Sequence, residues 1–212
     1  MANTAFTETE KISKIHSVLE DVKDISVVSY IFFSLVLDYG LKQNDLLDST
    51  FDDIFCVNIS KKYPDIDLSD SELINLVPYE SRCETFRSLL PTRDYLHKML
   101  NRCAREEGFV ETLNVSNLQK TWAYTELAKG GSINAVMSHF SYRNSSFRFL
   151  TEFLGLPFGV CVSSGSYLLN IYARSCFSEL THMDYEHFSE EQQLEFLNLL
   201  HRILNLFDFL KQ

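Results

Sequence analysis

Glycine and proline are scarce in this chain: there are 7 and 4 of them in 212 residues, together about 5%, against roughly 12% in an average protein. This scarcity excludes a collagen-like chain and argues against a barrel built on glycine-rich turns. Hydrophobic residues make up 45% of the chain, which is enough for a packed core at this length. Few helix breakers and a normal hydrophobic content predict a mainly α-helical protein.

Membrane, metal and cofactor signatures are missing as well. The longest apolar run, Val27–Leu37, is broken by Ser29 and Ser34 and is too short to cross a bilayer, and the first residues have no signal-peptide pattern. The five cysteines include no C-x-x-C pair, and no phosphate-loop or dinucleotide motif is present. We therefore expect a cytoplasmic protein with free thiols, without a membrane partner, a metal or a cofactor.

Positive charge is in deficit, but unevenly so. The net charge is −10, which argues against a simple polybasic nucleic-acid binder. Residues 1–81 carry 6 Lys and Arg against 15 Asp and Glu, residues 82–148 carry 10 against 6, and residues 149–212 carry 3 against 8. The middle segment is thus a basic island, which is either a set of ordinary solvated helix faces or a local surface that faces phosphate.

Hydrophobic periodicity predicts helices along most of the chain. A capping box at Thr7 and Glu10 is expected to open the first helix. The further helices are expected at Ser26–Tyr39, Gln43–Asp48, Pro91 to about Gly108, Asn114 or Ser116 to about Gly130, Ile133–Ser138, Ser145–Phe153 and Ser189–Leu210. A small antiparallel sheet is expected between them, because Ile54–Ile59 is rich in β-forming residues and Glu72–Tyr79 is a candidate partner strand.

The composition changes after Leu154, so we expect two parts, residues 1–154 and a C-terminal helical extension, residues 155–212. The last helix, Ser189–Leu210, has a wide apolar stripe. It either closes the core or contacts a second copy of the chain or a partner protein.

Three motifs occur in an order that resembles the catalytic domain of tyrosine recombinases, the phage integrase family. The run Gly40-Leu-Lys-Gln-Asn-Asp45 and then Phe51-Asp-Asp-Ile54 is similar to the family's Gly-Leu-Arg-x-x-Glu and Trp-x-Asp-Ile. The segment 116–131 is similar to the box His-x-Leu-Arg-x-Thr with its following glycine, and the segment 133–141 to Ile-x-x-x-Leu-Gly-His-Ser-Ser. The resemblance covers about residues 8–150 and implies a recombinase-like catalytic-domain fold with an added C-terminal helical element.

The resemblance also identifies the positions that match the family's catalytic residues, which are Lys42, Asp45, Ser116, Gln119, His139 and Phe149. Lys42 keeps the charge of the first arginine but loses its planar fork. Ser116 and Gln119 replace the histidine and the second arginine, and Phe149 lies where the tyrosine nucleophile is expected. Without the nucleophile and the second arginine, no recombinase catalysis is expected.

Two functions remain. The first is a non-catalytic DNA-binding regulator of a phage or another mobile element, whose contact with double-stranded DNA is weak or depends on oligomerisation. Its candidate phosphate contacts are Lys42, Arg93, Arg105, Lys120, Lys129 and Arg143. The alternative is a protein-interaction module of the same fold, which pairs with itself or with a partner recombinase and does not bind DNA. Whether the six basic residues share one face distinguishes the two.

Overall fold

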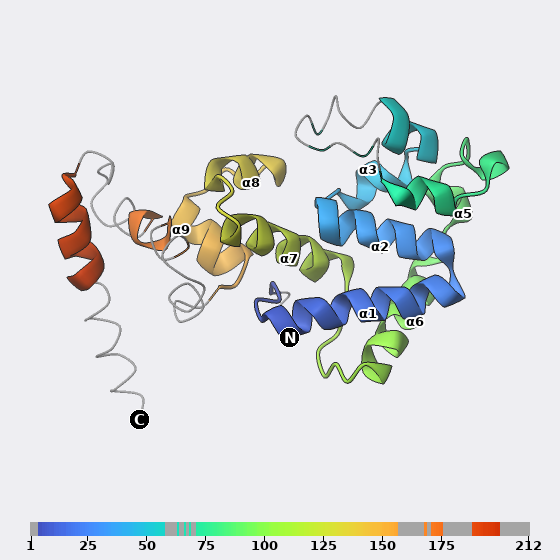
Figure 1. Cartoon of the computed structure of the whole chain (residues 1–212), viewed down its shortest axis with the longest axis horizontal. Coiled ribbons are helices and arrows are strands. Elements are labelled where there is room, and N and C mark those ends of the chain that lie inside the picture. Colours follow the sequence, from blue (N-terminus) through green and yellow to red (C-terminus); the bar gives the residue numbers. More distant parts are fainter. Residues whose placement is uncertain are drawn as a thin grey trace. The chain divides into compact units, whose positions relative to one another are not determined.

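The computed structural model describes residues 4–57, 63, 66, 68, 71–156, 168, 171–175 and 188–199. These residues are mostly helical (Figure 1), which confirms the expectation of a mainly α protein. They form two compact units, one up to Ala123 and one from Tyr124 onward. The expected division after residue 154 and the likeness to the recombinase fold stay predictions.

The first unit begins with the helices α1 (Thr9–Ile25), α2 (Val27–Tyr39) and α3 (Gln43–Leu47). α2 is capped by the Ser26 hydroxyl, which accepts a hydrogen bond from the Ser29 N–H at 3.3 Å. It ends at Gly40, whose φ of 68° is the left-handed conformation that favours glycine. The bounds of α2 and α3 agree to within one residue with the ones expected from the sequence.

The capping box expected at Thr7 and Glu10 is wrong. α1 begins at Thr9, and Glu8, the residue before it, makes no side-chain capping bond. Phe6, the residue before the expected capping box, makes long-range contacts instead. Its N–H donates to Thr121 Oγ1 at 2.9 Å, and its ring packs edge-on against Phe109. This long-range attachment keeps the residues before Glu8 out of the helix, and Glu8 itself is extended, so the helix starts later than the local pattern indicates.

The expected sheet is also wrong for the residues that the structure describes. Residues 51–57 are helical and end in the π-helical turn η1 (Asp53–Val57). Thr50 and Asp53 cap this helix reciprocally, since Thr50 Oγ1 accepts from the Asp53 N–H at 3.1 Å and Asp53 Oδ2 accepts from the Thr50 N–H at 3.2 Å. Residues 58 and 59 of the expected strand lie outside the described residues.

The expected partner strand is helical too. It forms the 3-10 turns η2 (Glu72–Leu76) and η3 (Tyr79–Ser81), and the Ser71 hydroxyl caps η2. The extended contact in this region is a single antiparallel bridge between Thr50 and Thr85. The β-forming side chains at 54 and 55 are buried from a helix, and β propensity is a weak preference that the surrounding structure overrides.

The first unit continues with α5 (Phe86–Leu89), α6 (Arg93–Glu106) and α7 (Val115–Ala128); the division between the units falls within α7. Asn114 caps α7, because its Oδ1 accepts from the Asn117 N–H at 3.0 Å. The stretch between α6 and α7 is held by Asn101, whose amide accepts from the Leu113 N–H and donates to the Leu113 carbonyl, both at 2.9 Å.

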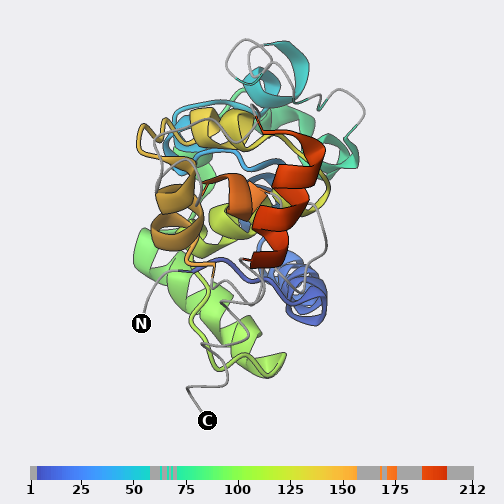
Figure 2. The same cartoon turned by 90° about the vertical axis from the view of Figure 1, so that its left-hand side faces the viewer.

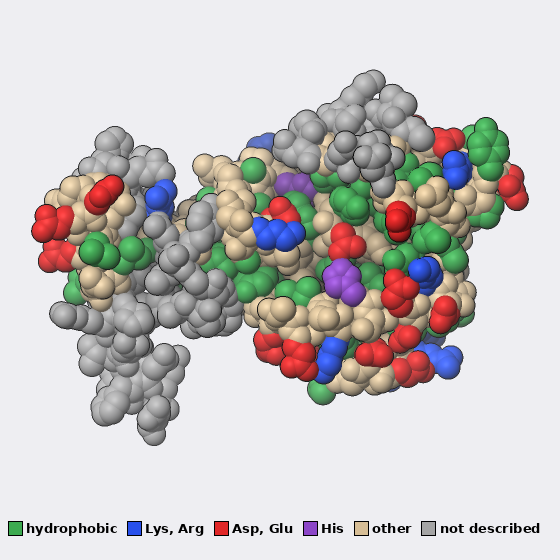
Figure 3. Space-filling view, in the orientation of Figure 1, with side chains coloured by type: hydrophobic (Ala, Val, Ile, Leu, Met, Phe, Trp, Pro, Cys, Tyr) green, Lys and Arg blue, Asp and Glu red, His purple; other side chains and the backbone are tan. Residues whose placement is uncertain are grey.

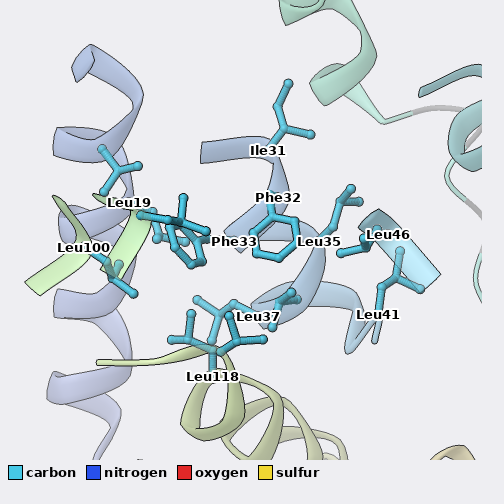
Figure 4. Packing of buried hydrophobic residues seen from close by; sticks show 14 of the residues in the cluster. Leu19, Ile31, Phe32, Phe33, Leu35, Leu37, Leu41, Leu46, Leu100 and Leu118 are labelled. Carbon is cyan, nitrogen blue, oxygen red and sulfur yellow. The ribbon is translucent and has the colours of Figure 1, made fainter. Parts of the chain in front are cut away.

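The core of the first unit is centred on α2, which is apolar nearly all round, as its sequence predicts. α1 packs against both α2 and α6 (Figures 1 and 2). Leu19 from α1, Leu100 from α6 and Leu118 from α7 surround the α2 side chains (Figure 4). Phe32 and Phe86 extend this core to α5, with ring centroids 6.2 Å apart.

The second unit contains α8 (Ile133–His139), α9 (Ser146–Arg148) and the π-helical turn η4 (Phe149–Phe153). Residues 171–175 and 190–199 are also helical. The Ser189 hydroxyl accepts from the Gln192 N–H at 3.3 Å and caps the last of these helices at the position expected for Ser189–Leu210. Residues 200–210 of that expected helix lie outside the described residues.

Candidate functional site

Two of the recombinase-like boxes meet in the first unit. Gln119 of α7 donates a hydrogen bond from Nε2 to the Leu41 carbonyl at 3.2 Å, which joins residues 78 positions apart. Three residues further along α7, the Trp122 ring packs on Gly40 so closely that a Cβ there would lie 2.6 Å from Trp122 Cε2. The glycine turn after α2 is therefore fixed both by its positive φ and by the α7 side chains.

Tyr63 completes this site, although the sequence did not single it out. Its hydroxyl donates to Asp45 Oδ2 and accepts from the Lys42 backbone N–H at 3.3 Å. We call Lys42, Asp45, Tyr63 and Gln119 the Lys42 cluster. A tyrosine in a polar stretch next to two lysines is a common pattern, so the sequence carried no distinct signal for it.

The electrostatics of the cluster keep Tyr63 protonated. Burial raises the pKa of the Tyr63 phenol well above its usual value, the hydrogen bond to Asp45 raises it further, and the Lys42 N–H acts in the opposite direction. An attacking tyrosine needs the reverse, a phenol that gives up its proton readily. In this structure the Tyr63 hydroxyl instead serves as a donor to Asp45 and an acceptor for the Lys42 backbone N–H.

Two further predicted residues lie on α7 beside the cluster. Ser116 precedes Gln119 by about one helical turn and is half-buried. Lys120 directly follows Gln119, and burial lowers the pKa of its ammonium group. Since Lys42 follows Leu41, each of these two lysines is one residue away from the hydrogen-bonded pair Leu41 and Gln119.

The remaining remnant positions belong to the second unit. Phe149 is fully buried among aromatic rings, with centroids 5.1 Å from both Tyr142 and Phe153. Phe149 is therefore a core residue of the second unit. His139 ends α8, with its ring edge-on to Phe140 at 5.2 Å.

The other basic candidates are spread over the two units. Arg93 and Arg105 lie near opposite ends of α6, about 18 Å apart along its axis at 1.5 Å per residue, so they cannot contact one phosphate. Lys129 and Arg143 belong to the second unit, where Lys129 pairs with Glu126 at 3.2 Å. On the face drawn in Figure 3, basic side chains of the described residues are scattered singly among acidic ones.

Within the described ranges, no group of three metal-ligand side chains is placed to hold a metal ion. Nor does any helix found there have the length and hydrophobicity needed to span a bilayer.

Comparison with known proteins found no matching family model, no similar curated protein and no similar solved structure. The resemblance to tyrosine recombinases therefore rests on the three motifs and their order.

Proposed function

We propose that this chain is a non-catalytic DNA-binding regulator of a phage or another mobile element, built on a degenerate tyrosine recombinase domain. The main support is the hydrogen bond between Gln119 and the Leu41 carbonyl. It brings together two boxes whose counterparts in the family clamp the DNA phosphate, and it leaves Lys42 and Lys120 beside the junction.

The chemistry of the cluster favours binding over cleavage. Lysine attracts phosphate as a point charge, whereas the bidentate geometry of an arginine fork is missing at both box positions. Tyr63 is held in its protonated form by burial and by Asp45. The site can contribute charge and hydrogen bonds to a DNA backbone, without a group prepared for attack on phosphorus.

Two lysines give weak binding. Each neutralised phosphate contributes about −0.9 to the slope of log K against log salt concentration, so two contacts predict about a tenfold loss of affinity between about 50 and 200 mM salt. Oligomerisation raises the effective concentration of a second such site and thereby the overall affinity. We therefore expect binding that is weak for one chain and stronger for an oligomer.

The test is fluorescence anisotropy on mixed genomic and mobile-element duplexes at about 50 mM salt, where phosphate contacts are strongest. The variant Lys42→Glu/Lys120→Glu should lose binding. The charge-matched control Lys14→Glu/Lys23→Glu changes two partly exposed lysines of α1 and should retain most of it. Absence of binding by the wild type, or an equal loss in both variants, overturns the proposal.

A second measurement addresses catalysis. Suicide DNA substrates should give no covalent adduct on any tyrosine, and an adduct would contradict the non-catalytic assignment.

One observation favours the alternative of a protein-interaction module. In the helix over residues 190–199, Leu194 and Leu199 are 60% and 54% exposed. Exposed leucines on one helix mark a surface that a partner can cover. If this helix pairs two copies of the chain, Leu194→Ser/Leu199→Ser should reduce the mass measured by light scattering from that of a dimer to that of a monomer. A wild type that is monomeric at all concentrations contradicts self-pairing.

A further inference from the structure

A groove of about 490 Å³ lies between α1 and α6 in the first unit, away from the Lys42 cluster. Its α1 wall consists of Asp21, Asp24 and Ile25. Its α6 wall follows the helical spacing i, i+3, i+4, i+7 and includes Tyr95, Lys98, Met99 and Arg102. This spacing is typical of surfaces that receive another helix.

The two walls run antiparallel. The last residues of α1 face the beginning of α6, because Ile25 and Tyr95 line the same groove. Toward the start of α1, Lys11 pairs with Glu111 beyond the end of α6 at 2.8 Å. The α6 wall extends from Tyr95 to Glu106, which is about 16 Å at 1.5 Å per residue. A helix of about three turns matches this length.

The groove has an apolar part that is open to solvent. Tyr95 is 54% exposed and Ile25 is 49% exposed, whereas Met99 beneath them is buried. A large aromatic and a β-branched side chain exposed together, with charges around them, mark a protein contact surface. Tyrosine in particular contributes strongly to such contacts when it becomes covered.

The charges on the two walls differ in sign. Among the described residues Asp21 and Asp24 of α1 make no ion pair, and neither does Lys98 of α6. Arg102, on the same wall as Lys98, pairs within α6 with Glu106 at 3.1 Å. A helix seated in the groove would therefore meet two carboxylates on the α1 flank. On the α6 flank it would meet Lys98, which makes no ion pair among the described residues, and the Arg102–Glu106 pair.

We propose that this groove binds an amphipathic helix of a partner protein, about three turns long, with basic side chains facing α1 and acidic side chains facing α6. The charges argue against the helix over residues 190–199 of a second copy as the occupant. The helix over residues 190–199, which exposes leucines, carries Glu190, Glu191 and Glu195 and no basic residue, so it would meet like charge along α1. The inference does not depend on DNA binding, because the groove and the Lys42 cluster share no residue.

The test uses the full-length chain labelled with ¹⁵N and two helical peptides with the same leucine stripe. One peptide has lysines on one flank and glutamates on the other, and the second has glutamates on both flanks. The first should bind saturably, with chemical-shift changes concentrated on α1 and α6, and the second should bind more weakly.

Two variants of groove residues and one control variant test the proposal further. Tyr95→Ala should weaken binding of the first peptide about tenfold or more. Asp21→Asn/Asp24→Asn should weaken binding of the first peptide about fivefold, because two exposed charge pairs are lost. The variant should therefore also discriminate less between the first peptide and the all-glutamate peptide. The control Tyr79→Ala removes another tyrosine of the first unit, 83% exposed, and should have no effect on peptide binding. All three should bind DNA like the wild type, which separates this inference from the proposed function.

Several outcomes overturn the proposal: no saturable binding of the first peptide, equal binding of both peptides, shift changes elsewhere, or full binding by Tyr95→Ala. Shift changes on α1 and α6 that depend on protein concentration without any peptide would assign the groove to a second copy instead.

Discussion

Gly40 is the position where the addition of a single methyl group should destabilise the folded state most. It ends α2 with a φ of 68° and lies under the ring of Trp122, so that an added Cβ would be 2.6 Å from Cε2 and nearer still to two other ring atoms. Trp122 is the only tryptophan of the chain. The substitution Gly40→Ala therefore adds backbone strain and steric overlap at one point.

The two contributions can be estimated separately. An L-residue in the left-handed region costs about 1–2 kcal/mol, and forcing an extra carbon into a packed contact costs about 1–3 kcal/mol. Gly40→Ala should thus lower the free energy of unfolding by about 2–5 kcal/mol. Gly108 is the matched control, because its φ is 82° but nothing lies within 4 Å of its Cβ position. Gly108→Ala should cost only the first contribution.

Urea unfolding followed by far-UV circular dichroism measures both variants. A double-mutant cycle with Trp122→Ala isolates the overlap, since without the ring Gly40→Ala should cost no more than Gly108→Ala. Trp122 fluorescence in Gly40→Ala should also shift in wavelength, because the ring must move. Equal costs for Gly40→Ala and Gly108→Ala, or an unchanged cost in the Trp122→Ala background, would refute the reasoning.

Three further predictions concern hydrogen bonds of the first unit. The raised pKa of Tyr63 stabilises the folded state fully below about pH 10, and this contribution is lost as the pH rises toward the folded pKa. The stability difference between wild type and Tyr63→Phe should therefore shrink by about 1.4 kcal/mol from about pH 9 to pH 11 in urea titrations, and a constant difference contradicts it. Thr50→Ala should lower the free energy of unfolding by about 1 kcal/mol through loss of the cap, and Thr50→Ser should lower it much less. Equal urea midpoints for the two variants would argue against the cap. Asn101→Ala leaves the Leu113 backbone without its side-chain partner and should lower the free energy of unfolding by about 1–3 kcal/mol. Hydrogen exchange at the Leu113 amide should accelerate. Unchanged exchange would contradict a stabilising role of the Asn101 hydrogen bonds.

Helices whose ends are marked by capping residues or glycines were predictable from the sequence. α2 lies between a serine cap and a glycine, and α6 ends before Gly108. These signals act within a few residues and do not depend on the rest of the fold. The start of α1 was not predictable, because Phe6 is held by Thr121, a residue 115 positions away.

The prediction of a strand at residues 54–59 was wrong for a related reason. β propensity at residues 54–59 was weighed without the reciprocal cap of Thr50 and Asp53, which is a sequence signal for a helix start. Ile54 and Phe55 are buried equally well from a helix. Propensity is therefore a weak guide wherever both conformations bury the same side chains.

The candidate site was predictable in part. The motif comparison selected Lys42, Asp45 and Gln119, and the structure places all three around one turn. Tyr63 was missed because its partners come from another segment of the chain. The charge count found the basic island but not its geometry, since Arg93 and Arg105 alone are separated by most of the length of α6.

The bond between the Phe6 N–H and Thr121 also concerns the timing of synthesis. Its two partners are 115 residues apart, which a ribosome needs about 6 to 23 s to add at 5–20 residues per second. During that interval the apolar stripe of α1 and the surface of α2 that α7 later covers lack part of their packing. The nascent first unit is thus expected to be a substrate for chaperones until α7 emerges, and ribosome-bound chains that end before α7 should be sensitive to protease at α1.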